Sequence, residues 1–165
     1  DVASVSADVP PLTYRLIGRP VKDDMAVGYA RLCGQYAVAS AVLTGALGID
    51  DFAPAAISGS VRLELAGRVT ITADANPDPN ALSPITVTVR LRDGREHAKT
   101  LTAIYGNPAN PMTHEAHLAK FRTNAKAAAK PLSDEAIAAL IAMVDDLENQ
   151  KSTAPLLALA FGESA

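Results

Sequence analysis

The stretch ITVTVRLRDG, residues 85–94, decides how the fold is interpreted. From Ile85 to Leu91, apolar residues alternate with polar ones, a period of two that is typical of a strand with one buried face. Asp93-Gly94 follows at once, and this pair tolerates the positive φ of a two-residue hairpin turn. We therefore predict an antiparallel hairpin whose second strand spans Glu96–Ile104.

Three segments nearer the N-terminus are also extended in character. Val2–Val9 and Arg68–Ala73 show the same alternation as the hairpin, and we predict a strand for each. The run Leu12–Ile17 follows a pair of prolines, and we predict a further short strand there.

A helix is predicted between these strands. From Gly28 to Leu47, apolar residues recur at steps of three and four, and Gly48 follows as a helix stop. Nearly the whole circumference of this helix is apolar or small, so we expect it to be the central buried element. We also interpret Ala55–Leu65 as helical, although its alternating Val61, Leu63 and Leu65 would equally suit a strand.

After the hairpin the pattern becomes helical. We predict an ordered turn at Gly106–Pro111, then helices that begin after the capping residues Thr113 and Ser133, and a short apolar helix at Pro155–Phe161. The order of strands, helix, strands and helices indicates an α+β fold. We expect residues 1–165 to form one α+β domain, an antiparallel sheet with a long buried helix and C-terminal helices packed against it.

Composition excludes several classes of function. The chain has 165 residues, 48% of them hydrophobic, which suits one globular domain, and its net charge is -3 without a basic stripe. We therefore expect no nucleic-acid partner. No window approaches the roughly 18 apolar residues of a membrane span, and the start lacks a signal-peptide pattern, so we expect no membrane association and a cytoplasmic location.

Motifs for metals, nucleotides and nucleophiles are weak. His114 and His117 are three residues apart, whereas the zinc-helix pattern needs a spacing of four, so we interpret them as a solvated first helical turn and expect no metal. The glycines never form a phosphate-cradling loop, and we expect no cofactor. The single cysteine, Cys33, lies in an apolar helical stripe and is more typical of a packed small hydrophobe than of a nucleophile.

Tyr36 leaves two interpretations open. On the buried side of the predicted helix, a tyrosine is most often a core residue whose hydroxyl is satisfied by a neighbour. The other interpretation is a phenol presented into a cleft, where it could donate a hydrogen bond to a carboxylate or a developing oxyanion. Gly34, Ala37 and Ser40 leave room beside the ring, which favours the second interpretation somewhat.

Several motifs, in order along the chain, resemble the C-terminal domain of the MmgE/PrpD family. They are Arg19-Pro20-Val21-Lys22, the segment Tyr29–Tyr36 with its Gln35-Tyr36 pair, Leu43-Thr44-Gly45, the strand and turn Val87–Arg95, the segment Gly106–Thr113, and Lys120-Phe121. Each match alone is weak, but together they span nearly the whole chain. The family includes 2-methylcitrate dehydratase, cis-aconitate decarboxylase and iminodisuccinate epimerase.

The resemblance implies a cofactor-free lyase or isomerase. Such enzymes move a proton next to a carboxylate of a small di- or tricarboxylic acid, and in this family an N-terminal helical domain supplies most catalytic residues. The position that matches a catalytic tyrosine of the family is Tyr36, so the resemblance implies that Tyr36 is catalytic. Arg31 is implied as a substrate-binding residue or, alternatively, as a helix-surface charge. We expect a homodimer of a longer protein, with little turnover by this chain alone.

A different class of function remains open. The chain could be a non-catalytic binding or assembly module that packs against a partner helical domain or against its own copy. The two hypotheses differ in what the complete protein carries, because only the enzyme requires a helical domain that bears a catalytic base.

Overall fold

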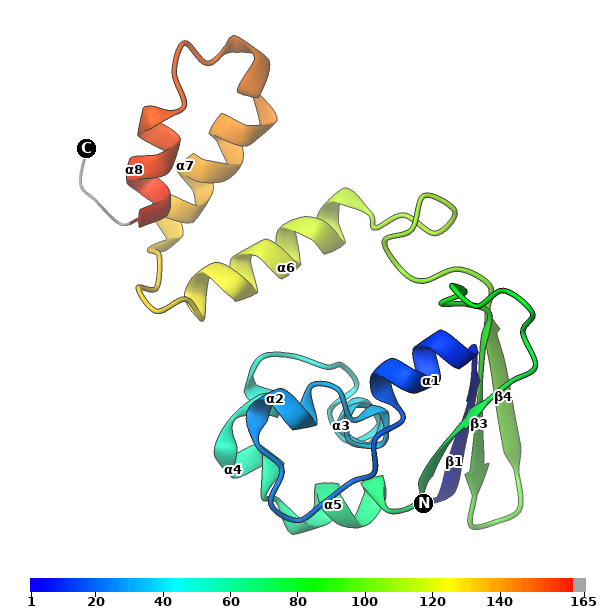
Figure 1. The fold of residues 1–165 in the computed structure, drawn as a ribbon. Helices are drawn as coiled ribbons and strands as arrows, with labels where there is room; N and C mark the ends of the chain where they lie inside the picture. Colours follow the sequence, from blue (N-terminus) through cyan, green and yellow to red (C-terminus); the bar gives the residue numbers. More distant parts are fainter. Residues whose placement is uncertain (162–165) are drawn as a thin grey trace. The chain divides into compact units, whose positions relative to one another are not determined.

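The structure is a computed structural model that describes residues 1–161, and it shows two compact units (Figure 1). Unit 1 comprises Asp1–Asn110 and contains every described strand, whereas unit 2 begins at Pro111 and is helical. The α+β class predicted from the sequence is confirmed. No described helix is both long and apolar enough to cross a lipid bilayer.

A four-stranded sheet forms one layer of unit 1. Its strands lie in the order β2-β1-β3-β4, with bounds β1 (Val2–Val9), β2 (Val69–Ala73), β3 (Ile85–Leu91) and β4 (Glu96–Leu101). β3 pairs antiparallel with β1 and β4, but β1 and β2 are parallel, so the sheet is mixed and the expectation of a purely antiparallel sheet is wrong. The long helical connection between β1 and β2 makes the parallel pairing possible.

The predicted hairpin is confirmed, but its turn is longer than two residues. The last paired residues are Arg90 and Glu96, and the Leu91 N–H donates to the Arg95 carbonyl at 2.8 Å. The Gly94 N–H donates to the Leu91 carbonyl at 3.1 Å, and Gly94 has φ of 87°. The turn therefore includes Arg92, with glycine at the left-handed position of a three-residue loop.

The strand predicted for Leu12–Ile17 is wrong. This segment is helix α1 (Pro11–Ile17), with Pro11 in its first turn. Proline is favoured there because its fixed φ suits a helix and its missing N–H would have no partner in the helix. The proline pair therefore starts a helix here instead of joining two strands.

The predicted long helix is two helices, α2 (Val27–Ala30) and α3 (Gly34–Thr44). Cys33 separates the two helices because its backbone is extended, with φ of -100° and ψ of 99°. α3 ends at Gly45, which has φ of 78°, three residues earlier than the predicted stop. The buried residues of α3 lie before Ala41, so only its N-terminal part is a central buried element.

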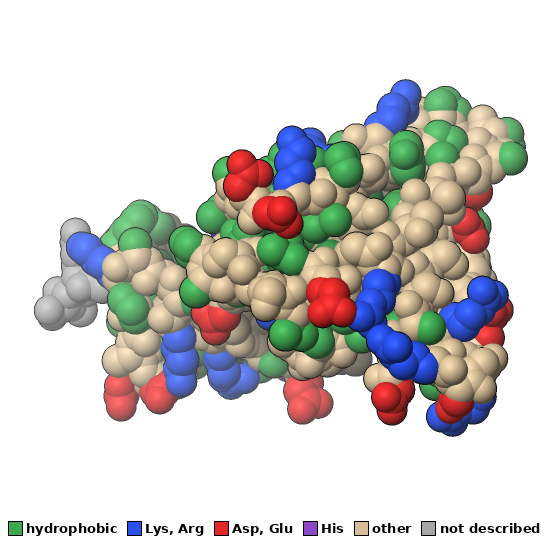
Figure 2. Space-filling view, turned by 90° about the horizontal axis from the view of Figure 1, so that it is seen from below, with side chains coloured by type: hydrophobic (Ala, Val, Ile, Leu, Met, Phe, Trp, Pro, Cys, Tyr) green, Lys and Arg blue, Asp and Glu red, His purple; other side chains and the backbone are tan. Residues whose placement is uncertain are grey.

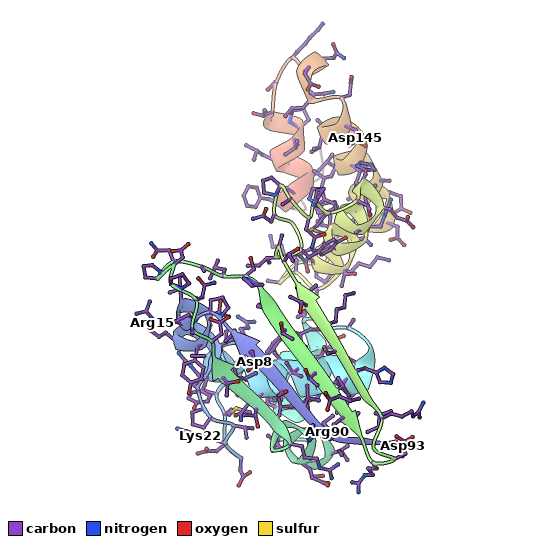
Figure 3. All side chains as sticks on the ribbon, turned by 90° about the vertical axis from the view of Figure 1, so that its right-hand side faces the viewer. Asp8, Arg15, Lys22, Arg90, Asp93 and Asp145 are labelled. Atoms are coloured by element: carbon purple, nitrogen blue, oxygen red, sulfur yellow. The ribbon has the colours of Figure 1, made fainter. Side chains whose placement is uncertain are left out.

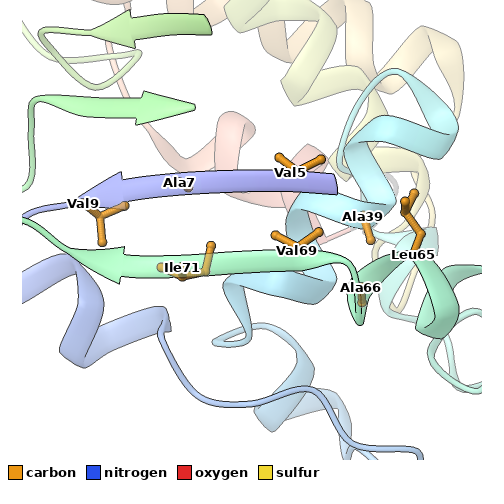
Figure 4. Close-up of a cluster of buried hydrophobic side chains, with 8 residues drawn as sticks. All are labelled: Val5, Ala7, Val9, Ala39, Leu65, Ala66, Val69 and Ile71. Carbon is orange, nitrogen blue, oxygen red and sulfur yellow. The ribbon is translucent and has the colours of Figure 1, made fainter. Parts of the chain in front are cut away.

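The segment after α3 contains three short helices. They are the 3-10 turn η1 (Asp50–Phe52), α4 (Pro54–Ile57) and α5 (Ser60–Ala66), so the helical interpretation of Ala55–Leu65 is confirmed. Alternate residues of β1 and β2 pack with Ala39 of α3 and Leu65 and Ala66 of α5, and this buried group is called cluster 1 (Figure 4). Cluster 1 contains Val5, Ala7, Val9, Ala39, Leu65, Ala66, Val69 and Ile71.

Unit 2 contains three predicted helices and one short 3-10 turn. The described elements are α6 (His114–Lys126), α7 (Asp134–Asp145), η2 (Leu147–Asn149) and α8 (Ala154–Phe161). The hydroxyl of Thr113 accepts a hydrogen bond from the Ala116 N–H, and that of Ser133 accepts one from the Ala136 N–H. Both predicted N-caps are therefore confirmed.

Candidate functional site

Tyr36 lies in a second buried group of unit 1. This group, called cluster 2, contains Met25, Ala30, Cys33, Tyr36 and Ile57. The Tyr36 side chain is 0% exposed, and the Phe52 ring of η1 lies against it at 5.9 Å between ring centroids. The expectation of a phenol presented into a cleft is not met in this arrangement, because the segment 51–57 covers this side of α3.

The hydroxyl of Tyr36 uses both of its hydrogen-bonding functions. It donates to the backbone carbonyl of Asp51, and it accepts from Nη1 of Arg62 at 3.0 Å. A phenol can donate only one hydrogen bond. A substrate could therefore receive that hydrogen bond only if the Asp51 carbonyl moved away.

Asp51 and Arg62 form a nearly buried ion pair beside Tyr36. Nη2 of Arg62 lies 2.9 Å from Oδ1 of Asp51, and their side chains are 14% and 11% exposed. Nη1 of Arg62 also donates to the Asp51 carbonyl at 3.2 Å, and Oδ2 of Asp51 accepts from the Gly48 N–H at 2.7 Å. This pair is not predicted from the sequence, and the one local signal for Arg62 is its place between the apolar residues Val61 and Leu63 of α5.

Gln35, the neighbour of Tyr36, connects three segments of the chain. Its side-chain oxygen accepts from the Val21 N–H at 2.8 Å, and its side-chain nitrogen donates to the Val69 carbonyl at 2.8 Å. The Gln35-Tyr36 pair therefore ties α3 to the loop after α1, to β2 and to η1.

Arg31 reaches Tyr36 only through an aromatic ring. It is exposed, and its guanidinium carbon lies 5.9 Å from the centroid of the same Phe52 ring that packs on Tyr36. The structure thus places the two predicted site residues on one cluster, with Tyr36 inside it and Arg31 at the surface.

Cys33 is buried, and its environment disfavours the thiolate. Its side chain is 0% exposed, and its Sγ donates to the Arg19 carbonyl at 3.4 Å. Burial raises the pKa of the Cys33 thiol above its ordinary value, although the neighbouring backbone N–H groups of Tyr36 and Gln35 act in the opposite direction. This environment supports the interpretation of Cys33 as a packed small hydrophobe.

The raised pKa of Cys33 predicts a loss of stability at alkaline pH. Above the ordinary thiol pKa, the unfolded chain releases this proton while the folded chain still holds it, so unfolding becomes easier as the pH rises. The contribution is complete below the ordinary pKa and is lost as the pH rises through the raised one. Urea unfolding at about pH 7 and about pH 10 should therefore show a smaller alkaline loss for Cys33→Ala than for the wild type. Equal losses would contradict the prediction.

A surface hollow lies beside the buried ion pair. Its volume is about 320 Å³, and it is lined by Leu43, Ala56, Gly59, Ser60, Val61 and Arg62. Arg62 therefore borders both this hollow and the Tyr36 hydroxyl, whereas Tyr36 does not line the hollow.

The carboxylates with displaced pKa values do not suit a general base near neutral pH. A hydrogen bond from the Arg95 side chain lowers the pKa of Asp93, and backbone hydrogen bonding at the start of α7 lowers that of Glu135. A base that works near pH 7 needs a raised carboxylate pKa. His114 and His117 are exposed on α6, and residues 1–161 contain no group of three side chains suited to a metal ion.

One comparison with known proteins agrees with the motif order. A search of curated proteins found no match. The family model described as the MmgE/PrpD C-terminal domain matches residues 1–146, a range that covers unit 1 together with α6 and α7. The chain therefore belongs to the MmgE/PrpD family and carries its C-terminal domain.

Proposed function

We propose that this chain is the C-terminal part of a longer, cofactor-free lyase or isomerase. The enzyme would abstract a proton next to a carboxylate of a small di- or tricarboxylic acid. The match of the family model over residues 1–146 carries the proposal. The ordered motifs support it, because they include the Gln35-Tyr36 pair at the centre of unit 1.

The proposal divides the chemistry between two parts of the longer protein. Removal of a proton next to a carboxylate needs a base of suitable pKa and hydrogen-bond donors for the enediolate, both protected from water. The buried carboxylate of Asp51 is held by Arg62 and by the Gly48 N–H, so we assign the base to the remainder of the protein. On this proposal the 165-residue chain alone shows little or no turnover.

We assign a positioning role to Tyr36. Its hydroxyl donates a hydrogen bond to the Asp51 carbonyl and accepts one from Arg62. These two hydrogen bonds fix η1 and α5 relative to α3. Direct hydrogen bonding from Tyr36 to the substrate, as the resemblance implied, would require the segment around Asp51 to open. The two roles predict different losses of stability and of kcat when the hydroxyl is removed.

Proton exchange tests the proposed reaction class. The complete protein is incubated in D₂O with methylcitrate, cis-aconitate and other small di- and tricarboxylic acids, and deuterium entry next to a carboxylate is followed by NMR. We expect exchange or turnover with at least one acid without any added cofactor, and none above background with the 165-residue chain. Activity with none of the acids, or only after a cofactor is added, would overturn the proposal.

Tyr36→Phe in the complete protein distinguishes the two roles of Tyr36. The positioning role predicts a loss of about 1 kcal/mol in stability, because one buried hydrogen bond is removed while the ring stays in place. It also predicts that kcat falls by less than about tenfold, whereas the loss of a direct oxyanion donor costs about 100-fold or more. Thermal unfolding and steady-state kinetics provide the two measurements. A 100-fold lower kcat with an unchanged Tm would instead show that Tyr36 contacts the substrate.

One observation favours assembly as a second candidate function. Val42 and Leu43 of α3 and Val61 of α5 are 40%, 44% and 66% exposed. Figure 2 shows apolar side chains at the surface of one face, among charges of both signs. If the surface of Val42, Leu43 and Val61 serves assembly of copies, the molar mass of the 165-residue chain in light scattering should rise with concentration. The Val61→Asp variant should have a lower molar mass than the wild type at the same concentration. A constant monomer mass would remove this candidate.

A further inference from the structure

Two positive side chains of unit 1 lie against a single aromatic ring. The guanidinium carbon of Arg19 is 5.1 Å from the centroid of the Tyr29 ring, and Nζ of Lys22 is 4.8 Å from the same centroid. Each contact is favourable, because the face of an aromatic ring carries partial negative charge. The two cations nevertheless repel each other, and a ring offsets only part of that repulsion.

Neither cation has an acidic partner in the described part of the chain. Every ion pair between residues 1 and 161 involves other basic residues, namely Arg62, Arg68, Arg90, Arg95 and Lys126. Arg62 differs from Arg19 and Lys22 in this respect. Its guanidinium carbon also lies over a tyrosine ring, 5.7 Å from the centroid of Tyr36, but its charge is neutralised by Asp51. The positive charge at Tyr29 is thus uncompensated by any direct ion pair in a chain whose net charge is -3.

The backbone that carries these side chains is fixed by side-chain hydrogen bonds. The Tyr29 hydroxyl donates to the Pro20 carbonyl at 2.8 Å, and the Arg19 carbonyl accepts from Cys33 at 3.4 Å. The Val21 N–H donates to Gln35 at 2.8 Å. The backbone of residues 19–21 and the Tyr29 ring are therefore fixed before any ligand arrives, which lowers the entropic cost of binding.

Arg31 lies against a different ring from Arg19 and Lys22 and is not part of their pair. It follows Tyr29 by two residues, is exposed, and rests against Phe52, and both rings pack on cluster 2. Lys22 is also exposed and lies at the edge of unit 1, well away from Asp93 at the hairpin tip (Figure 3). The neighbouring Asp23 and Asp24 are exposed, and their charge weakens the attraction for an anion without neutralising the cations directly.

We propose that Arg19 and Lys22, which lie against the Tyr29 ring, form a binding site for a small polycarboxylate. The guanidinium group of Arg19 and the ammonium group of Lys22 donate charge-assisted hydrogen bonds to carboxylate oxygens, and Tyr29 holds the two side chains beside each other. A ligand with two or three carboxylates can engage more than one cation, whereas a monocarboxylate cannot. That this polycarboxylate is the substrate rests on the proposed function, but the existence of the site does not.

Titration of the isotopically labelled 165-residue chain tests the site. The probe is 1,2,3-propanetricarboxylate, acetate is the monocarboxylate control, and backbone amide shifts are followed by NMR at about 50 mM salt. We expect saturable shifts confined to residues 19–35, with acetate at least about tenfold weaker. Equal effects of acetate and the tricarboxylate, or no saturable shift at all, would overturn the proposal.

Variants locate the binding and separate it from the proposed function. Arg19→Gln/Lys22→Gln should weaken tricarboxylate binding by at least about tenfold, whereas Arg90→Gln, which removes a paired cation on β3, should leave it unchanged. Because Arg19 is only half-exposed, the single variant Lys22→Gln provides a second test on an exposed side chain. Unchanged binding in both variants would refute the site.

Kinetics of the complete protein test the identity of the ligand. If the polycarboxylate is the substrate, Arg19→Gln/Lys22→Gln should raise KM while kcat changes little, because the site binds without taking part in the chemical step. If the chain binds the tricarboxylate but KM does not change, the site stands and its assignment to the substrate is refuted.

Discussion

Replacement of Leu65 by alanine is expected to destabilise unit 1 by about 3 kcal/mol. Leu65 lies in α5 and is 9% exposed, and it fills cluster 1 between the helical layer and the sheet. Its truncation removes buried apolar surface and leaves a cavity that the surrounding strands can close only in part. Urea unfolding followed by far-UV circular dichroism should show a lower midpoint with a similar slope.

Val61 provides a matched control on the same helix. It stands one turn before Leu65 but is 66% exposed, so Val61→Ala should change the stability of the isolated chain by no more than about 0.5 kcal/mol. Alanine also has the higher helix propensity, which acts against any small loss of packing. Similar losses in the two variants would show that cluster 1 is not the core of unit 1.

Asp51→Ala is expected to cost about 3 kcal/mol through a different mechanism. The substitution leaves Arg62 in place but removes its carboxylate partner, and it also leaves the Gly48 N–H without an acceptor. A nearly buried guanidinium without a counter-charge is costly, because it has lost most of its contact with water. The expected result is a lower urea midpoint together with changed NMR signals of the Tyr36 side chain.

Two further variants test the cause of this loss. Glu64→Ala removes a carboxylate that pairs with Arg68 at the surface, where its side chain is 67% exposed, and should cost less than about 1 kcal/mol. Asp51→Ala/Arg62→Met removes both charges and should recover part of the stability lost in Asp51→Ala. A double variant as unstable as the sum of its single variants would show that the unpaired charge is not the cause.

Local patterns predicted the elements of the fold that depend on neighbouring residues. The alternation at Ile85–Leu91 placed β3 correctly, and the capping residues Thr113 and Ser133 placed the starts of α6 and α7. The proline pair before Leu12 starts a helix and not a strand, because the preference of Pro11 for a first helical turn outweighs the extended character of the residues that follow it.

Features that join distant residues could not be read from local patterns. Nothing in the alternation of β1 and β2 tells whether they run parallel, since that depends on the path of the chain between them. The periodicity of α3 placed Tyr36 on a buried side, but its partners are 15 and 26 residues away, at Asp51 and Arg62. The motif order, in contrast, identified the family without any of these contacts, and the family model confirms it.

The place of β1 in the sheet has a consequence for folding during synthesis. Of the strands of this sheet, β1 leaves the ribosome first, yet it lies between β2 and β3, whose last residues are Ala73 and Leu91. Neither of its edges can be paired until those later segments have emerged, and closing such long loops is slow. The apolar face and at least one edge of β1 therefore stay exposed until β3 has emerged, and during this interval the nascent chain is most in need of chaperones.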